Sequence, residues 1–331
     1  MQPNFPLYVT RPNGEGQPPA STSNAVLAAY GMSSLALEYM GHTSQQRRSD
    51  CSRGRNWSSL EPPIHLYKYR PIIASDSESI NRIRQMLVHG RIWVADPSSL
   101  NDLHDMRFKL ELNTDPQIRR QWIKRNAHLL PKMSPARRIQ EEQRLIRASL
   151  TKDVADYFTT DIEQNIGVFC ASQDPRNEPM WAHYADDHRG ICVQLDTSQD
   201  ELFLLLNKVQ YSSQFPTIRV PHLPNEATDH FVFKSSEWAY EREWRVVIPR
   251  NRFSIELRPP TVAGVILGAR ADQATRSAIE ALNAERIELG HPAFKLYQAK
   301  QHKDRYGVRI TKIESQLSAI EGQRPAPSPN P

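Results

Sequence analysis

Two short segments of this chain bring tryptophan, tyrosine, histidine, arginine and carboxylate side chains together, and they restrict how the chain folds. The first is Met180–Gly190 and the second is Trp238–Arg245. Burying such mixtures costs free energy unless each polar group finds a partner. The two segments therefore belong either to a polar network shared inside a core or to the wall of a site.

Composition places few limits on the class of protein. The chain has 331 residues, of which 39% are hydrophobic, so it can bury a full core as one large domain or two ordinary ones. A formal net charge of +5 suits an anionic partner without requiring one. The spacings of Cys51, Cys170 and Cys192 match neither a zinc module nor a disulfide framework, which indicates a reducing compartment. No apolar run approaches the roughly 20 residues of a membrane-spanning helix, so we expect a cytoplasmic protein without a membrane partner.

We expect the folded part to be one domain over residues 63–315. Residues 1–62 are polar and rich in glycine, proline and serine, which predicts a disordered leader with a weak helical patch at 25–39. Residues 316–331 form a proline-rich tail that we expect to be flexible. The leader is poor in acids and contains serine, so a second interpretation is the secretion signal of a bacterial effector that acts in a host cell.

The hydrophobic pattern between these ends predicts short strands interrupted by helices. Ile64–Arg70 alternates like a strand, Ser77–His89 has helical spacing, and Arg91–Ala95 is again a strand. Further strands are expected at 106–112, 168–171, 191–196, 241–248, 262–267, 294–297 and 306–310, with helices within 116–158 and at 271–285. This order predicts an α+β fold with mixed, mainly antiparallel small sheets and flanking helices.

The loop at 98–105 joins two expected strands and contains Asn101 and Asp102. Such residues usually bond to their own backbone in a turn, but loops at strand ends also concentrate binding residues. The helical region at 116–158 is rich in arginine. A basic face of this kind contacts nucleic acid or simply faces solvent.

In the first polar segment we expect a helix from Met180 to about His188, ending at Gly190. Four-residue spacing would place His183 beside Asp187, and a carboxylate there orients an imidazole for general-base catalysis or ligand binding. In the alternative interpretation, Trp181 and Tyr184 pack inward and the histidine and aspartate form a surface pair.

The second polar segment predicts a strand with Glu241, Glu243 and Arg245 on one face. Two close carboxylates repel, so one stays protonated or both recruit a cation such as Lys234 or Arg245. The same group describes either a site that orients a ribose or activates a nucleophile, or a buried ion network that holds a strand in place.

An ordered series of motifs resembles the bacterial family called domain of unknown function 2971. The series comprises Tyr67–Arg70, Trp93-x3-Pro97-x2-Leu100-Asn101-Asp102-x2-Asp105, Cys170–Ser172, Met180–Cys192, Lys234-x3-Trp238-x-Tyr240-Glu241-x-Glu243-Trp244-Arg245 and Gly268. The resemblance covers roughly Leu66 to Ile310 and implies a setting of phage defence or abortive infection. One departure is Leu100–Asp105, where the family usually has Phe-Asn-Asp-Pro-Phe followed by Asp or Glu.

The layout is also similar to that of ADP-ribosyltransferases, which makes NAD the candidate cofactor. By this analogy Arg70 would hold NAD, Tyr184 would stack on nicotinamide, and Glu243 would stabilise the ribosyl cation with help from Glu241. The candidate catalytic residues are thus Glu243, Glu241 and His183. The candidate ligand-binding residues are Tyr67, Arg70, Asn101, Asp102, Trp181, Tyr184, Lys234 and Arg245.

Two other functions fit the same residues. One is a metal-dependent nuclease or hydrolase, whose divalent ion would draw on His183, Asp187, His188, Asp102, Asp105 or Glu241, although no residue is assigned to a metal. The other is a non-catalytic module that recognises a nucleotide or a partner. In each case we expect an anionic small molecule or nucleotide as ligand, with nucleic acid as a further candidate partner.

Overall fold

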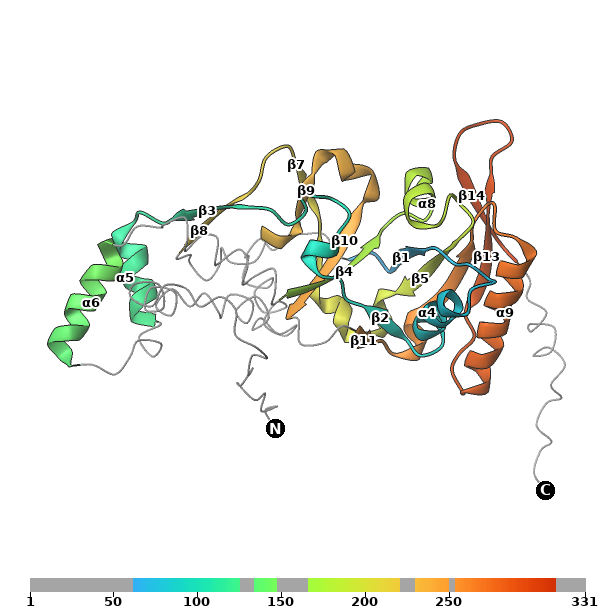
Figure 1. Cartoon of the computed structure of the whole chain (residues 1–331), viewed down its shortest axis with the longest axis horizontal. Helices are drawn as coiled ribbons and strands as arrows, with labels where there is room; N and C mark the ends of the chain where they lie inside the picture. The colour runs from blue at the N-terminus through green and yellow to red at the C-terminus, as the bar shows by residue number, and fades with distance from the viewer. Residues whose placement is uncertain (1–61, 126–133, 148–165, 221–229, 250–253, 314–331) are drawn as a thin grey trace, which may run out of the picture.

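The computed structural model describes residues 62–125, 134–147, 166–220, 230–249 and 254–313 (Figure 1). Residues 1–61 of the predicted leader, with the helical patch, and the predicted tail at 316–331 lie outside the described residues. The predicted α+β class is confirmed, because the strands form mixed, mostly antiparallel sheets with helices packed against them. Among the described helices, none is long and apolar enough to cross a membrane.

An eight-stranded sheet forms the centre of the molecule, in the order β14-β13-β12-β5-β1-β4-β10-β6. Its strands are β1 (His65–Arg70), β4 (Ile166–Ser172), β5 (Ile191–Asp196), β6 (Leu206–Lys208), β10 (Glu243–Pro249), β12 (Val262–Leu267), β13 (Lys295–Gln301) and β14 (Val308–Lys312). Neighbours run antiparallel except β12 and β13, which are parallel.

Three two-stranded sheets surround this centre. They pair β2 (Arg91–Trp93) with β11 (Ser254–Glu256), β3 (Lys109–Leu112) with β8 (Thr217–Val220), and β7 (Gln210–Ser212) with β9 (Phe233–Ser235). The α-helices are α4 (Ser77–Leu87), α5 (Pro116–Arg125), α6 (Pro135–Arg147), α8 (Glu178–Tyr184) and α9 (Gln273–Glu288). The described 3₁₀ helices are η1 (Pro97–Ser99), η3 (Thr197–Gln199), η4 (Glu201–Leu205), η5 (His230–Val232), η6 (Ser236–Glu241) and η7 (Pro259–Thr261).

The two faces of the large sheet carry different cores. Leu66 of β1 and Val193 of β5 belong to the main core, which includes Ile83 of α4 and Leu282 of α9. Because side chains alternate along a strand, Tyr69 points to the other face. There it joins the hydrophobic cluster that is covered by α8.

Strands β1 and β4 are neighbours in the sheet but pair over only a small part of their length. Strand β1 pairs with β5 along all of its length, from His65 opposite Asp196 to Arg70 opposite Ile191. Its pairing with β4 is confined to Tyr67 opposite Ser172. Beyond that pair the backbones no longer form a ladder, which leaves room for side chains between the two strands.

The expected helix from Met180 to His188 is wrong in its second half. Helix α8 ends at Tyr184, and Asp186, Asp187 and His188 all have left-handed backbones with φ of 46°, 48° and 69°. A right-handed helix cannot continue through such residues. The expected pairing of His183 with Asp187 therefore does not form, and Asp187 instead lies 3.6 Å from Arg189.

The strands predicted from Glu241 and from Met106 begin later than the sequence pattern indicates. The strand predicted from Glu241 begins at Glu243, because Glu241 ends η6 and Arg242 is left-handed with φ of 46°. The strand predicted from Met106 begins at Lys109, since Met106 has φ of 57°.

Candidate functional site

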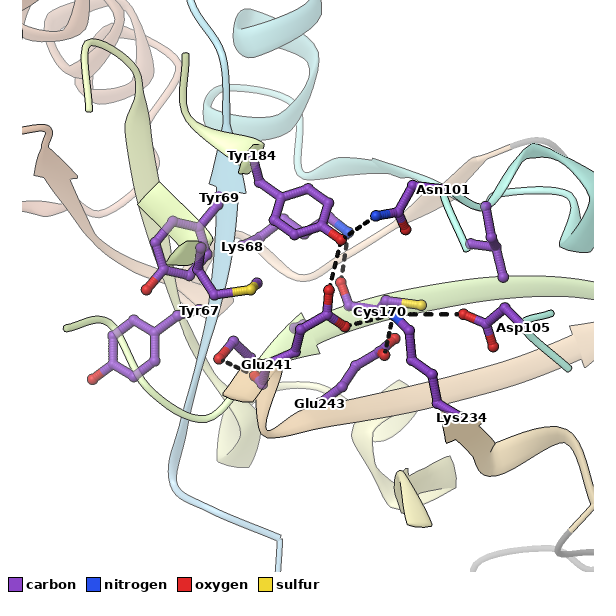
Figure 2. A pocket seen from close by; sticks show the side chains of 14 residues that line it. Tyr67, Lys68, Tyr69, Asn101, Asp105, Cys170, Tyr184, Lys234, Glu241 and Glu243 are labelled. Atoms are coloured by element: carbon purple, nitrogen blue, oxygen red, sulfur yellow. Dashed lines mark hydrogen bonds and ion pairs between the residues drawn. The ribbon is translucent and has the colours of Figure 1, made fainter. Parts of the chain in front are cut away.

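A cavity of about 120 Å³ lies where β1 and β4 separate (Figure 2). The two strands provide its back wall, and the loop after η1, helix α8, β9 and β10 complete it. Its polar lining residues come from segments far apart in the chain, for example Asn101, Tyr184 and Glu241. The fold therefore builds this cavity through tertiary contacts.

Two glutamates and a lysine lie together at the floor of the cavity. The ammonium of Lys234 lies 2.5 Å from Glu241 Oε2 and 3.4 Å from Glu243 Oε2. All three side chains are buried. The Lys234 ammonium also lies over the ring of Trp238, 4.8 Å from its centroid.

Beneath this floor a buried arginine joins two carboxylates. Arg245 donates to both oxygens of Glu243, at 2.8 and 3.0 Å. It also donates to both oxygens of Asp105, at 2.7 and 2.6 Å. Because two-residue alternation places Glu243 and Arg245 on the same face of β10, the strand itself holds the first pair together.

The network moves the pKa values of the two glutamates in opposite directions. Burial would raise the pKa of Glu243, but Arg245 and Lys234 outweigh it and lower the pKa to about 2. Burial raises the pKa of Glu241, and the charge of Glu243 adds to the rise, although Lys234 opposes it. Glu243 is thus ionised at any physiological pH, whereas Glu241 is the group placed to exchange a proton.

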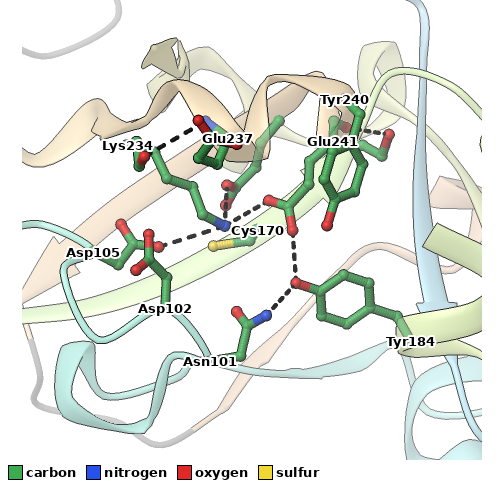
Figure 3. A network of polar contacts seen from close by, with 12 residues as sticks. Asn101, Asp102, Asp105, Cys170, Tyr184, Lys234, Glu237, Tyr240 and Glu241 are labelled. Carbon is green, nitrogen blue, oxygen red and sulfur yellow. Dashed lines mark hydrogen bonds and ion pairs between the residues drawn. The ribbon is translucent and has the colours of Figure 1, made fainter. Parts of the chain in front are cut away.

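A short chain of hydrogen bonds leads from Glu241 to the surface (Figure 3). The hydroxyl of Tyr184 donates to Glu241 Oε1 at 2.6 Å and accepts from the amide of Asn101, also at 2.6 Å. Asn101 is exposed while Glu241 is buried. The mouth of the cavity therefore lies at Asn101.

Lys68 fills the gap between the separated strands. Its ammonium donates to the backbone oxygen of Cys170 at 2.6 Å, so it satisfies a carbonyl beyond the point where β1 and β4 stop pairing. Burial lowers the pKa of Lys68 to about 8, with a further contribution from the charge of Arg70. The cavity thus has a cationic back wall beside its acidic floor.

The comparisons with known proteins bear on this region directly. The sequence model of the family described as "Protein of unknown function (DUF2971)" matches residues 180–246. The predicted resemblance is confirmed over this stretch, and outside it the resemblance stays a prediction. No curated protein and no solved structure matches the chain.

The DUF2971 match contains both polar segments and most of the predicted site. Within it Tyr184, Lys234, Glu241 and Glu243 line the cavity, and Arg245 lies beneath them. Outside the match, the predicted residues Tyr67 and Asn101 line the cavity as well. The structure thus brings together seven of the eleven residues that the sequence singled out as catalytic or ligand-binding.

The other four predicted residues lie elsewhere. His183 is exposed and does not line the cavity, and its ring lies near that of Tyr240, with centroids 6.4 Å apart. Trp181 is fully buried and donates to the backbone oxygen of Pro175 at 2.9 Å. Arg70 and Asp102 are not among the lining residues of this cavity.

Several residues of the site were not assigned to it from the sequence, among them Asp105, Lys68 and Cys170. Asp105 was considered only as a metal ligand, yet it pairs with Arg245. Lys68 was noted only as part of a motif, and Cys170 only for its motif and the cysteine spacing, yet both line the cavity. For Lys68 a signal existed, because a lysine in the middle of a strand that has strands on both sides is unusual unless it is paired. Within the described ranges, no group of three or more His, Cys, Asp or Glu residues could hold a metal ion.

Proposed function

We propose that this chain is an ADP-ribosyltransferase-like enzyme. It would break the bond between nicotinamide and ribose in NAD and pass ADP-ribose to a nucleophile on a protein or nucleic acid. The observation that carries the proposal is the pair Glu241 and Glu243, which share one cavity and have pKa values shifted in opposite directions. Environments that separate the pKa values of two acids are typical of sites that use one as an ion and the other to move protons.

The geometry supports roles for Glu241 and Glu243 that differ from those implied by the analogy with ADP-ribosyltransferases. Glu243 is held by Arg245 and Lys234, so its charge helps to fix the position of Lys234 and supplies a steady negative field. Glu241 bonds to Tyr184 and faces the cavity, and it is thus the better candidate to contact substrate. The first role belongs to a positioning residue and the second to a catalytic residue.

The proposed reaction is balanced without a redox partner. As the bond from ribose C1′ to the nicotinamide nitrogen breaks, its electron pair neutralises the pyridinium ring. Positive charge then develops on the ribose, where an ionised Glu241 stabilises it. The attacking nucleophile forms the new bond to C1′ and gives its proton to Glu241, whose raised pKa favours accepting it.

The walls of the cavity suit a flat aromatic group. Tyr67, Tyr69 and Tyr184 all line it, and stacked or edge-on aromatic contacts stabilise a planar ring. The amide of Asn101 lies at the mouth, where it can bond a carboxamide. A cavity of about 120 Å³ accommodates one such ring, so the remainder of a dinucleotide would extend outward past Asn101.

Nicotinamide release from NAD tests the proposal. The purified chain should release nicotinamide, and Glu241→Gln should lower the rate by about 10²–10⁴-fold, the usual contribution of an acid–base residue. Glu237→Gln is the matched control, because Glu237 is an exposed glutamate in the same η6 turn. The activity should survive a chelator. Cleavage of nucleic acid that a chelator abolishes would favour the hydrolase instead, and inactivity in both assays would favour a recognition module.

The resemblance to the family supports a biological setting that can be tested separately. We place the enzyme in the cytoplasm of a bacterium, where ADP-ribosylation during infection would stop phage production. Plaque counts on bacteria that express the wild-type chain should fall relative to bacteria that express Glu241→Gln. Appearance of the chain in the culture medium would favour the alternative of an exported effector.

A further inference from the structure

The hairpin formed by β13 and β14 reaches beyond the body of the sheet at its outer edge (Figure 1). Strand β13 ends at Gln301 and β14 begins at Val308, so residues 302–307 form the tip. The exposed residues of its outer half are Lys300, Gln301, Lys303, Asp304, Arg305, Tyr306 and Arg309. We call Lys300, Lys303, Arg305, Tyr306 and Arg309 the hairpin cluster.

The charges of the hairpin cluster are not compensated. Four cations face a single nearby carboxylate, Asp304, which leaves a local formal charge of +3. As far as the structure describes the chain, none of the four forms an ion pair. Several exposed arginines elsewhere do pair, for example Arg82 with Glu78 at 2.8 Å and Arg91 with Glu256 at 2.9 Å.

Two of these cations lie directly opposite each other. Lys300 and Arg309 are register partners in the β13–β14 ladder. Like charges at directly opposite positions destabilise an antiparallel pair, so this arrangement weakens the hairpin until an anion lies between them. A carboxylate at one of the two positions would instead stabilise the pair.

An aromatic side chain accompanies the charges. Tyr306 at the tip is 100% exposed, so its ring has no contact that explains its position. A simpler explanation of charged residues on an edge strand is that they block pairing with another sheet. That explanation accounts for Arg309 on the edge strand β14 and leaves Tyr306 without a role.

We propose that the hairpin cluster binds single-stranded nucleic acid. The four cations would contact successive phosphates, and an unpaired base would stack on Tyr306, which is the usual combination in sites that bind single strands. The surface is separate from the cavity, because β12 and β5 lie between the β13–β14 hairpin and β1 in the sheet. The inference does not depend on the proposed NAD chemistry.

Fluorescence anisotropy with a labelled oligo(dT) strand at several salt concentrations tests this inference. Wild type should bind with an affinity that falls as salt rises. Lys303→Ala with Arg305→Ala should weaken binding and make the slope of log affinity against log salt shallower by roughly 1 to 2, because two phosphate contacts are lost. Tyr306→Ala should weaken binding by about 5- to 150-fold, the effect of losing one stacked base.

The matched control is Arg82→Ala with Arg91→Ala, which removes two exposed cations that are paired elsewhere on the surface. This variant should bind like wild type. Equal affinities for wild type and both hairpin variants would overturn the inference, as would binding to phosphatidylserine vesicles without binding to the oligonucleotide. Tighter binding to duplex than to single strand, with no effect of Tyr306→Ala, would overturn the single-strand assignment.

Discussion

The guanidinium of Arg245 holds the carboxylate of Asp105 through two hydrogen bonds of 2.7 and 2.6 Å, although 140 positions separate the residues in the chain. This contact fixes the loop after η1 to strand β10. The same loop carries Asn101, which bonds Tyr184 at the mouth of the cavity. The floor and the mouth are therefore connected through one short loop.

Replacing Arg245 with methionine should strongly destabilise the fold. The change would leave Asp105 and Glu243 buried with only Lys234 nearby, and removing one partner of a buried ion pair typically costs about 3–5 kcal/mol. Urea unfolding followed by circular dichroism measures the loss. Arg91→Met removes an exposed partner of Glu256 and should cost less than about 1 kcal/mol. Equal losses in the two variants would contradict a central role for Arg245.

Acid should weaken the fold through Glu243. Its pKa of about 2 in the folded chain lies below the ordinary value of 4.5, so the unfolded chain binds more protons between these values. Stability from this residue is present above pH 4.5 and is lost as the pH falls toward 2, by on the order of 3 kcal/mol. Glu243→Gln should flatten the fall in unfolding free energy over that range, whereas Glu237→Gln should not. An unchanged slope in Glu243→Gln would show that the pKa of Glu243 is not lowered.

Lys68 should change the stability of the fold at alkaline pH. Its pKa of about 8 lies below the ordinary value of 10.5, so the unfolded chain holds more protons between these values. The cost of burying the charge is fully present below pH 8 and is relieved as the pH rises to 10.5. The free energy of unfolding of wild type should thus gain about 3 kcal/mol over this range relative to Lys68→Met. The control is Lys295→Met, at an exposed position of β13. A gain of wild type relative to Lys295→Met, without a gain relative to Lys68→Met, would contradict the prediction.

Local sequence patterns were sufficient to predict most elements of the sheet. The strands at 191–196 and 262–267 match β5 and β12, because alternation and flanking turn residues depend only on neighbours in the chain. The helix predicted from Met180 ends at Tyr184, earlier than predicted, because tertiary contacts decide where it ends. There, Gly190 packs so closely on β1 that an added Cβ would lie 2.3 Å from the backbone oxygen of Arg70.

The candidate site was predictable in its residue types and less so in their arrangement. The spacing of Glu241, Glu243 and Arg245 indicated a cluster of charges, and the structure shows one. The reason differs from the one expected, since Glu241 reaches Lys234 from the end of η6 and not from the strand. No local pattern could show that Asp105 would complete the network from a distant loop.

Tyr184→Phe should shift the pH dependence of the proposed activity. The hydroxyl of Tyr184 donates to Glu241, and this hydrogen bond holds the pKa of the carboxyl below the value that burial alone would give. Without the donor the pKa of Glu241 rises further, so a reaction that needs the ionised carboxylate loses rate at a higher pH than in wild type. Profiles of kcat/KM against pH should show the acidic limb moved to higher pH. Tyr306→Phe, which changes an exposed tyrosine that does not line the cavity, should leave the profile unchanged. An acidic limb at the same pH in wild type and Tyr184→Phe would show that Glu241 is not the group that titrates in the reaction.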